Sequence, residues 1–456
     1  MMGRPMTVPR AVAPASFLAA APQRAAGTDS PRAFLERCLE RIAALEPQIG
    51  AFVALAAEGA RLAADRAGER WRAGRPLSPI DGMPFGVKDI IETADLPTEM
   101  GSPLFAGWRS GRDAASVAAL REAGAVMLGK TVTTEFAASE PRGTRNPWDL
   151  ERTPGGSSSG SAAAVACGML PAALGTQVVG SIVRPASFCG VVGFKPSLGA
   201  LNRGGSFDHL SQSCHGVIAA SLAEAWVVAR IVSARAGGDP GHPGLAGPAE
   251  PPPARPPRAL ALIETAGWAV AEPAARAALE SALDRLRASG IAILTRRQRP
   301  ELAALEAGLA TAIDLTRRIN AWEGRWPLNE LRRRNAAQLS RIALDTLAQA
   351  EAMSREDYAA LIAERARLRA QYAVLGGLCD AAVTLAAPGP APLGLASTGN
   401  PVFAAPGSLL GVPAVSLPVL QADGLPLGLQ LVGFAQEDAA LVGLAAWIEG
   451  LFAERN

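Results

Sequence analysis

Beyond residue 80, short apolar segments alternate with segments whose apolar residues have helical spacing, and Gly or Pro separates the two kinds. The first part of this pattern predicts a strand over 83–91, a helix over 113–123, a strand over 125–128 and a helix over 160–167. Strands that alternate with helices form a sheet whose two faces are covered by helices. The sequence therefore predicts an α/β fold.

The same kind of pattern extends to the C-terminus. A Pro/Gly-rich stretch over 237–257 predicts a linker or a surface excursion. Residues 301–378 are helical in pattern and rich in Arg, Glu and Ala, which indicates an inserted subdomain that acts as a lid or as a homodimer contact. The other predicted elements are helices from Ser30-Pro31 onward and over 50–73, 271–289 and 438–453, and strands over 259–263, 291–294, 381–387, 412–419 and 427–433.

Composition and charge argue against several classes of protein. A net charge of +2, without Lys/Arg runs interleaved with aromatic residues, predicts no nucleic-acid partner. No unbroken apolar stretch is long enough to span a bilayer, so we expect no membrane association. Residues 1–28 are rich in Ala, Pro and Arg, and we expect a poorly ordered leader there. The five cysteines have no CxxC spacing, which is typical of a reduced, cytoplasmic protein without structural zinc.

Lysine is confined to one part of the chain. Only three of the 44 basic residues are lysines, namely Lys88, Lys130 and Lys195, and they flank the Gly/Ser run over 155–161. Lysine can release its proton when it is desolvated, whereas arginine cannot. Codon bias explains the abundance of arginine but not the position of the lysines, which points to proton-transfer chemistry in this region.

The Gly/Ser run over 155–161 admits three interpretations. A flexible linker would lie in polar, low-complexity sequence, but an apolar helix of small residues follows at once. A phosphate loop would need a lysine after its last glycine, and none follows. A catalytic loop at a helix N-terminus would offer backbone donors and several hydroxyl groups. The run by itself leaves the choice open.

A nucleophile and a base are available near this run. Ser181 follows an apolar segment in a tight turn, and Lys88 ends an apolar strand. A serine hydroxyl needs a base, and none of the three histidines has the sequence context of one, so we interpret them as structural or surface residues. A lysine acts as a base when burial lowers its pKa. Lys88, Ser157 and Ser181 would then form a proton path. The three histidines are His209, His215 and His242.

These residues belong to motifs whose order and spacing resemble the amidase signature family, from about residue 30 to the C-terminus. The motifs are Gly-Gly-Ser-Ser-Ser-Gly over 155–160, Ser181 downstream of it, Gly-Val-Lys-Asp over 86–89, Asn-Pro-Trp over 146–148, and the segments 188–196 and 425–433. The resemblance implies the amidase signature fold, in which a large mixed β-sheet is covered by helices on both faces. Residues 29–456 would form one domain with its core at about 75–235 and 380–456 and a helical insertion at about 300–378.

The resemblance also implies a Ser–cis-Ser–Lys triad acting on a small-molecule amide or carbamate. Ser181 would attack the carbonyl carbon, and Ser157, after a cis Gly156–Ser157 peptide, would pass the proton to Lys88 and later to the leaving nitrogen. Water would hydrolyse the acyl-enzyme, and no metal or organic cofactor would be needed. Lys130 and Lys195 would be structural. The oxyanion hole would consist of the backbone N–H groups of Val178, Val179, Gly180 and Ser181.

Around the nucleophile the chain departs from the commonest family pattern. Gln177 replaces Asp, Val178 and Val179 replace Thr and Gly, and Arg184 comes one residue later than the family's arginine. Gln177 and Arg184 are similar to a malonamidase-like subgroup, in which an arginine at this place is associated with binding of a substrate carboxylate. We expect Arg184 and Ser158 to bind substrate, and a structural ion pair is the alternative for Arg184.

Val179 bears most directly on activity. A glycine in this turn would permit backbone geometry and close substrate approach that a β-branched residue resists. We expect an active enzyme with a reshaped pocket, which cleaves an amide or, by the same attack, a carbamate or urethane. The alternatives are an amidotransferase A-type subunit, which net charge and the long helical insertion disfavour, and a catalytically silent binding protein.

Overall fold

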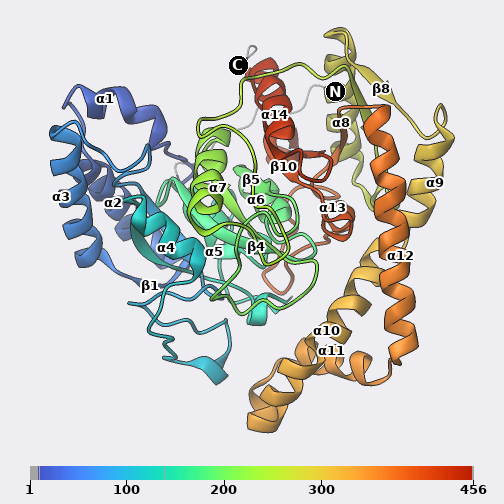
Figure 1. Cartoon of the computed structure of the whole chain (residues 1–456), viewed down its shortest axis with the longest axis horizontal. Helices are drawn as coiled ribbons and strands as arrows, with labels where there is room; N and C mark the ends of the chain where they lie inside the picture. Colours follow the sequence, from blue (N-terminus) through green and yellow to red (C-terminus); the bar gives the residue numbers. More distant parts are fainter. Residues whose placement is uncertain (1–8, 10, 139, 454–456) are drawn as a thin grey trace.

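The computed structural model describes residues 9, 11–138 and 140–453 (Figure 1). The strands in this part of the chain are β1 (Phe52–Leu55), β2 (Pro84–Lys88), β3 (Val126–Thr131), β4 (Ala172–Gln177), β5 (Val192–Lys195), β6 (Cys214–Ala219), β7 (Ala259–Leu262), β8 (Ala292–Leu294), β9 (Ala381–Leu385), β10 (Ala414–Ala422) and β11 (Leu425–Val432). Together they form one mixed sheet of 11 strands in the order β1-β3-β2-β4-β6-β5-β10-β11-β9-β7-β8. This architecture confirms the predicted α/β fold with a large mixed sheet.

Helices cover both faces of the sheet. They are α1 (Ala21–Ala25), α2 (Pro31–Ile49), α3 (Ala57–Arg72), α4 (Ala115–Glu122), α5 (Ser159–Ala166), α6 (Val183–Cys189), α7 (Leu222–Ala236), α8 (Pro273–Ala288), α9 (Pro300–Leu309), α10 (Ala312–Asn335), α11 (Arg341–Glu351), α12 (Arg355–Val374), α13 (Ala405–Leu410) and α14 (Asp438–Ala453). On β5, a Cβ atom added to Gly193 would lie 2.7 Å from Ala186 of α6, whereas the ring of Phe194 lies 6.3 Å from that of Trp226 on α7. Successive strand residues point to opposite faces, so α6 and α7 lie on opposite sides of the sheet.

Two neighbouring parallel strands place Lys88 beside the loop that carries Ser181. Val87 of β2 lies opposite Leu174 of β4, and the two strands run in the same direction. Lys88 is the last residue of β2 and Gln177 is the last residue of β4. Because the carboxyl ends of parallel strands meet at the same edge of a sheet, Lys88 lies beside the loop that leads from β4 into α6.

The N-terminal region differs from the sequence-based prediction at its first strand. The sequence predicts one helix over residues 50–73, but β1 precedes α3 and pairs with β3, and the residues of this short edge strand alternate between half-buried and exposed. The part of the expected leader at 1–8 and 10 lies outside the described residues. Within 11–28, Phe17 packs edge-on against Phe34 at 5.1 Å and the N–H of Leu18 donates to Glu224.

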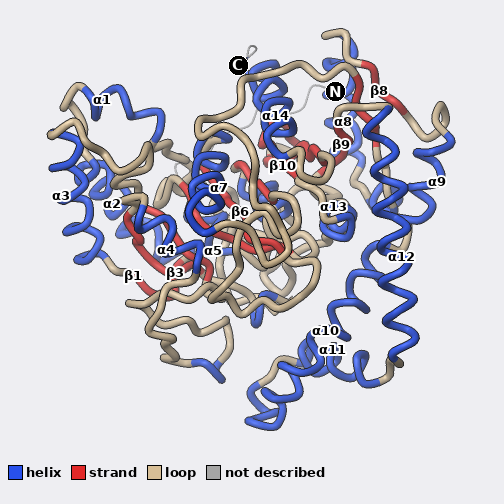
Figure 2. Tube along the Cα trace, in the orientation of Figure 1, coloured by secondary structure: helices blue, strands red, loops and turns tan. Residues whose placement is uncertain are grey.

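The helical segment expected between the two α/β parts of the chain is present. Between β8 and β9 the described chain runs through α9, α10, α11 and α12, and Figure 2 shows this arm entirely as helix and loop. The arm contacts the body through Ser211, whose N–H donates to Glu323 of α10 at 2.7 Å and whose Oγ accepts from Arg365 of α12 at 2.8 Å. None of the described helices is both long enough and apolar enough to cross a membrane.

Candidate active site

Lys88 is completely buried at the end of β2. Its Nζ donates to Oγ of Ser157 over 2.6 Å and to Oγ1 of Thr176 over 2.8 Å. No carboxylate in the described part of the chain forms an ion pair with it. Burial lowers the pKa of Lys88 to about 7, although the charge of Asp208 acts in the opposite direction. The amine can therefore take up and release a proton near neutral pH.

Ser157 lies in the loop that leads into α5, and its peptide bond with Gly156 is cis, as the family resemblance implies. The residue is buried, and its carbonyl oxygen accepts from the N–H of Thr134 at 3.3 Å. The packing here requires glycine. A Cβ atom at Gly156 would lie 2.6 Å from the methyl carbon of Thr398, and one at Gly160 would lie 2.2 Å from the carbonyl oxygen of Ala51.

Ser181 lies on the turn between β4 and α6, and Gln177 holds this turn in shape. The side-chain oxygen of Gln177 accepts from the N–H groups of Ile182 at 2.8 Å and Val183 at 3.0 Å, which satisfies donors at the start of α6. Its amide nitrogen donates to Oγ of Ser408 on α13 at 3.0 Å. The Oγ of Ser181 itself makes no hydrogen bond with any described residue.

The predicted oxyanion-hole donors have no internal partner. Within the described residues, none of the backbone N–H groups of positions 178–181 donates to another group. Their carbonyl groups are held instead, because Gln212 donates to that of Val178 at 3.2 Å and Ser408 donates to that of Val179 at 2.9 Å. A turn with its carbonyls fixed and several N–H groups unpaired is suited to stabilising an oxyanion.

The two valines fit this turn without backbone strain. Neither Val178 nor Val179 has a positive φ angle, so the conflict expected from a β-branched residue at position 179 does not arise. Both side chains are half-buried. The tightest packing against a neighbouring segment occurs at Gly180, where an added Cβ atom would lie 3.0 Å from the Cβ atom of Ala404.

Arg184 is buried on α6 and tied to the Gly/Ser loop. Its Nη2 donates to the carbonyl oxygen of Gly156 at 2.6 Å and to Oγ1 of Thr398 at 3.0 Å. The structural ion pair considered for this arginine is absent from the described residues, and its Nε is buried without an acceptor. Burial, with a smaller effect of the nearby charge of Arg317, lowers the pKa of Arg184 to about 9.

Ser158 occupies a different kind of position. It has no exposed surface, and its Oγ donates to the carbonyl oxygen of Thr176 at 3.4 Å. This contact supports the end of β4 and does not favour the predicted role of its side chain in substrate binding.

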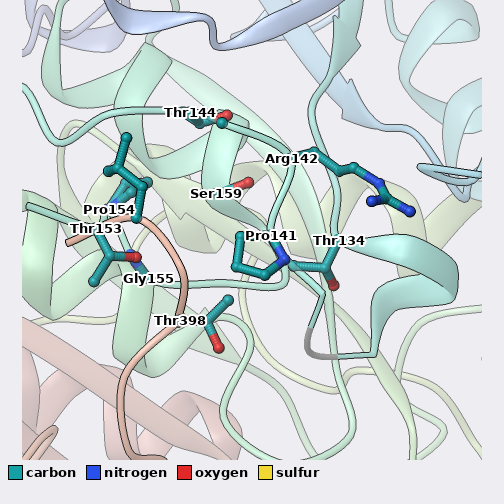
Figure 3. A pocket seen from close by; sticks show the side chains of 11 residues that line it. Thr134, Pro141, Arg142, Thr144, Thr153, Pro154, Gly155, Ser159 and Thr398 are labelled. Carbon is teal, nitrogen blue, oxygen red and sulfur yellow. The ribbon is translucent and has the colours of Figure 1, made fainter. Parts of the chain in front are cut away.

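A small pocket borders the same loop (Figure 3). Thr134, Gly155, Ser159 and Thr398 line it, but Lys88, Ser157 and Ser181 do not. Thr398 connects the pocket to the site, because it also accepts a hydrogen bond from Arg184.

The other two lysines lie apart from this constellation. Lys130 forms a completely buried ion pair with Asp89 at 2.8 Å, and Lys195 donates to the carbonyl oxygen of Pro196 at 2.9 Å. These contacts are compatible with the structural roles expected for both. His215 is also buried, and burial lowers its pKa to about 3, so it is neutral at physiological pH. No cluster of three or more His, Cys, Asp or Glu residues within the described chain is placed to hold a metal ion.

Sequence reasoning missed three residues that complete the environment of Lys88 and the turn: Thr176, Asp208 and Gln212. The contact of Thr176 with Lys88 depends on the pairing of β2 with β4, two strands that are distant in the sequence. Asp208 and Gln212 lie on a loop whose position depends on long-range packing, and no local motif marks them.

Comparison with known proteins places this geometry in a family. The Amidase family model matches residues 33–442. The A-type subunit of glutamyl-tRNA(Gln) amidotransferase from Chloroflexus aggregans is 34% identical over 451 residues, which cover 89% of this chain and 90% of that protein. Among solved structures, an amidase has 29% identity and a TM-score of 0.82, with 96% of this chain and 99% of that chain covered. The peptide amidase of Stenotrophomonas maltophilia has 26% identity and a TM-score of 0.78, with 95% and 96% covered. The chain belongs to the amidase signature family.

Proposed function

We propose that this protein hydrolyses a carbon–nitrogen bond of a small-molecule amide or carbamate through an acyl-enzyme on Ser181. The observation that carries the proposal is the 2.6 Å hydrogen bond from the buried Lys88 to Ser157. Oγ of Ser181 forms the new bond to the carbonyl carbon. Its proton passes by way of Ser157 to Lys88, which is neutral above about pH 7.

The second half of the reaction returns the proton. The carbon–nitrogen bond breaks as Ser157 delivers a proton to the leaving nitrogen and is itself reprotonated by Lys88. Water then attacks the acyl-enzyme, and the same relay takes its proton and restores Ser181. The unpaired N–H groups of the turn at 178–181 would stabilise the oxyanion in both steps.

We further propose that the substrate carries an acidic group recognised by Arg184. This guanidinium is buried without an ion-pair partner among the described residues, and it lies three residues after the nucleophile. An unpaired buried cation favours an anionic ligand. A substrate of this type would agree with the predicted malonamidase-like subgroup.

Ammonia release from a panel of small amides tests the proposal. Wild-type protein should hydrolyse at least one primary amide or carbamate, and Ser181→Ala should not. Arg184→Gln should lower kcat/KM for an acid-bearing amide, relative to its neutral analogue, by roughly 10- to 100-fold, as expected when a hydrogen bond to a charged group is lost. Equal losses of kcat/KM on both substrates would contradict recognition of an acidic group by Arg184 but would leave the proposed hydrolase activity standing. A complete lack of turnover would contradict the hydrolase itself.

A second candidate function is that of an amidotransferase A-type subunit. The observation in its favour is the 34% identity to this component of glutamyl-tRNA(Gln) amidotransferase over 89% of the present chain. Such a component would deliver ammonia within a complex. Purification from the native cell separates the two functions, because a member of such a complex should co-purify with stoichiometric partners and release ammonia from glutamine, whereas a stand-alone hydrolase should do neither.

A further inference from the structure

A second cavity, of about 550 Å³, lies where α12, the end of α13 and the connection from β11 to α14 meet. Figure 1 shows α12 and α14 on either side of α13. None of Lys88, Ser157, Ser181 and Arg184 lines this cavity. Cavities of this size accommodate small organic molecules, so its lining indicates what kind of molecule it suits.

Arg369 of α12 supplies an uncompensated positive charge to the cavity. Its Nε donates to the carbonyl oxygen of Leu409 at 3.0 Å, but its Nη2 is buried and has no acceptor within the described residues. No carboxylate there forms an ion pair with it. Burial lowers the pKa of Arg369 to about 10, and the nearby charge of Arg365 acts in the same direction. A guanidinium without an ion-pair partner favours an anionic ligand such as a carboxylate.

The rest of the lining includes apolar and aromatic residues. The rings of Tyr372 and Phe434 lie 5.2 Å apart, and the Tyr372 hydroxyl already donates to the carbonyl oxygen of Val432 at 2.9 Å. Tyr372 is only 1% exposed, so its ring packs against that of Phe434 and is not itself accessible to a ligand. Leu410 and Val412 add aliphatic surface to the lining. These walls would contact a flat apolar body through dispersion and area burial.

The other titratable groups of the lining leave the charge of Arg369 uncompensated. Glu437 and His242 are both exposed, and neither pairs with Arg369 or with any other described residue. Exposed charges are screened by solvent far more strongly than a partly buried guanidinium.

We propose that this cavity is a binding site for a small organic carboxylate with a flat apolar body. Its carboxylate would accept a hydrogen bond from Arg369, and its body would lie against Phe434, which Tyr372 supports. The site is separate from the proposed hydrolytic centre and does not depend on it. The two are joined by α13, since Ser408 of that helix donates to the carbonyl oxygen of Val179.

Isothermal titration of the full-length protein with 2-naphthoate tests the proposal, with uncharged 2-naphthylmethanol as the matched ligand. Wild-type protein should bind 2-naphthoate, and Arg369→Gln should weaken binding by roughly 10- to 100-fold through loss of charge-assisted hydrogen bonds. The matched control is Arg367→Gln on the same helix, whose exposed side chain pairs with Glu364 and should not affect binding. 2-Naphthylmethanol should bind at least about tenfold more weakly than 2-naphthoate to the wild type.

A second variant tests the site without removing the arginine. A Cβ atom at Gly376 would lie 3.8 Å from the ring of Phe434, an ordinary contact, so Gly376→Leu should fold and narrow the cavity beside this ring. It should weaken 2-naphthoate binding while Arg369 stays in place. The proposal is overturned if wild-type protein fails to bind 2-naphthoate, if Gly376→Leu binds it as well as wild type does, or if Arg184→Gln rather than Arg369→Gln removes binding.

Discussion

Lys88 donates a hydrogen bond from Nζ to Oγ of Ser157 over 2.6 Å, although 69 residues separate the two in the sequence. The lysine is completely buried, and the only other polar side chain that it contacts in the described structure is that of Thr176. Burial without a paired carboxylate stabilises the neutral amine. This pair therefore supplies a proton acceptor next to a hydroxyl group that can relay the proton.

Replacing Lys88 tests the relay. Lys88→Ala removes the acceptor, and Lys88→Arg keeps a cation that cannot be deprotonated. Both should lower kcat by about 100- to 10,000-fold, the usual contribution of a general base. Steady-state kinetics on an active amide measure the effect, and circular dichroism checks that each variant is folded. An active Lys88→Arg enzyme would contradict the assignment of Lys88 as the proton acceptor.

The pH dependence of kcat/KM should reflect the titration of Lys88. Below about pH 7 the amine is protonated and cannot accept the proton from the relay, so kcat/KM should rise with pH and reach a plateau above that value. The charge of Asp208 raises the pKa of Lys88, so Asp208→Asn should move the rising limb of the kcat/KM profile to lower pH. Asp345→Asn, on an exposed helix of the insertion, is the matched control and should leave it in place. A limb that Asp208→Asn does not move contradicts this assignment.

The sequence marks the residues of the candidate site more clearly than it marks their surroundings. Lys88, Ser157 and Ser181 could be named because each lies in a local motif at the end of a strand or the start of a helix. Thr176 was not recognised, because its contact with Lys88 depends on the parallel pairing of β2 with β4. Pairing between distant strands leaves no local pattern in the sequence.

Two elements near the N-terminus show the same limit. The strand β1 has only four residues and falls within a predicted helix. Four residues are too few to show the alternation of a strand clearly beside a longer helical pattern. The segment 11–28 is held by contacts of Phe17 and Leu18 with residues far along the chain. Its composition, rich in Ala and Pro, gives no sign of those contacts.

The valine beside the nucleophile should reshape the pocket rather than silence the enzyme. Val179 has an ordinary backbone conformation and a half-buried side chain, so Val179→Gly should enlarge the space beside the turn. We expect the kcat/KM ratio of a bulky to a small amide to rise by about tenfold or more, as when a pocket gains a few carbon atoms of space. Measurable turnover by wild-type protein is part of this prediction. A parent without turnover beside an active Val179→Gly variant would show that the valine is disabling.

The buried ion pair of Lys130 with Asp89 should contribute to stability rather than to catalysis. Lys130→Met leaves the Asp89 carboxylate buried without its partner and should lower the free energy of unfolding by about 3–5 kcal/mol. Urea denaturation measures this change. Arg341→Met removes an exposed ion pair with Asp345 and should cost less than about 1 kcal/mol. Equal effects of the two substitutions would contradict a special role for the buried pair.

Covalent labelling tests the role of Ser181 most directly. A fluorophosphonate should react with wild-type protein to give one adduct, and peptide mass spectrometry should locate it on Ser181. Ser181→Ala should show no adduct, and Lys88→Ala should label far more slowly because the proton acceptor is missing. Labelling that persists in Ser181→Ala, or an adduct found on Ser157 in the wild type, would contradict the assignment of Ser181 as the nucleophile.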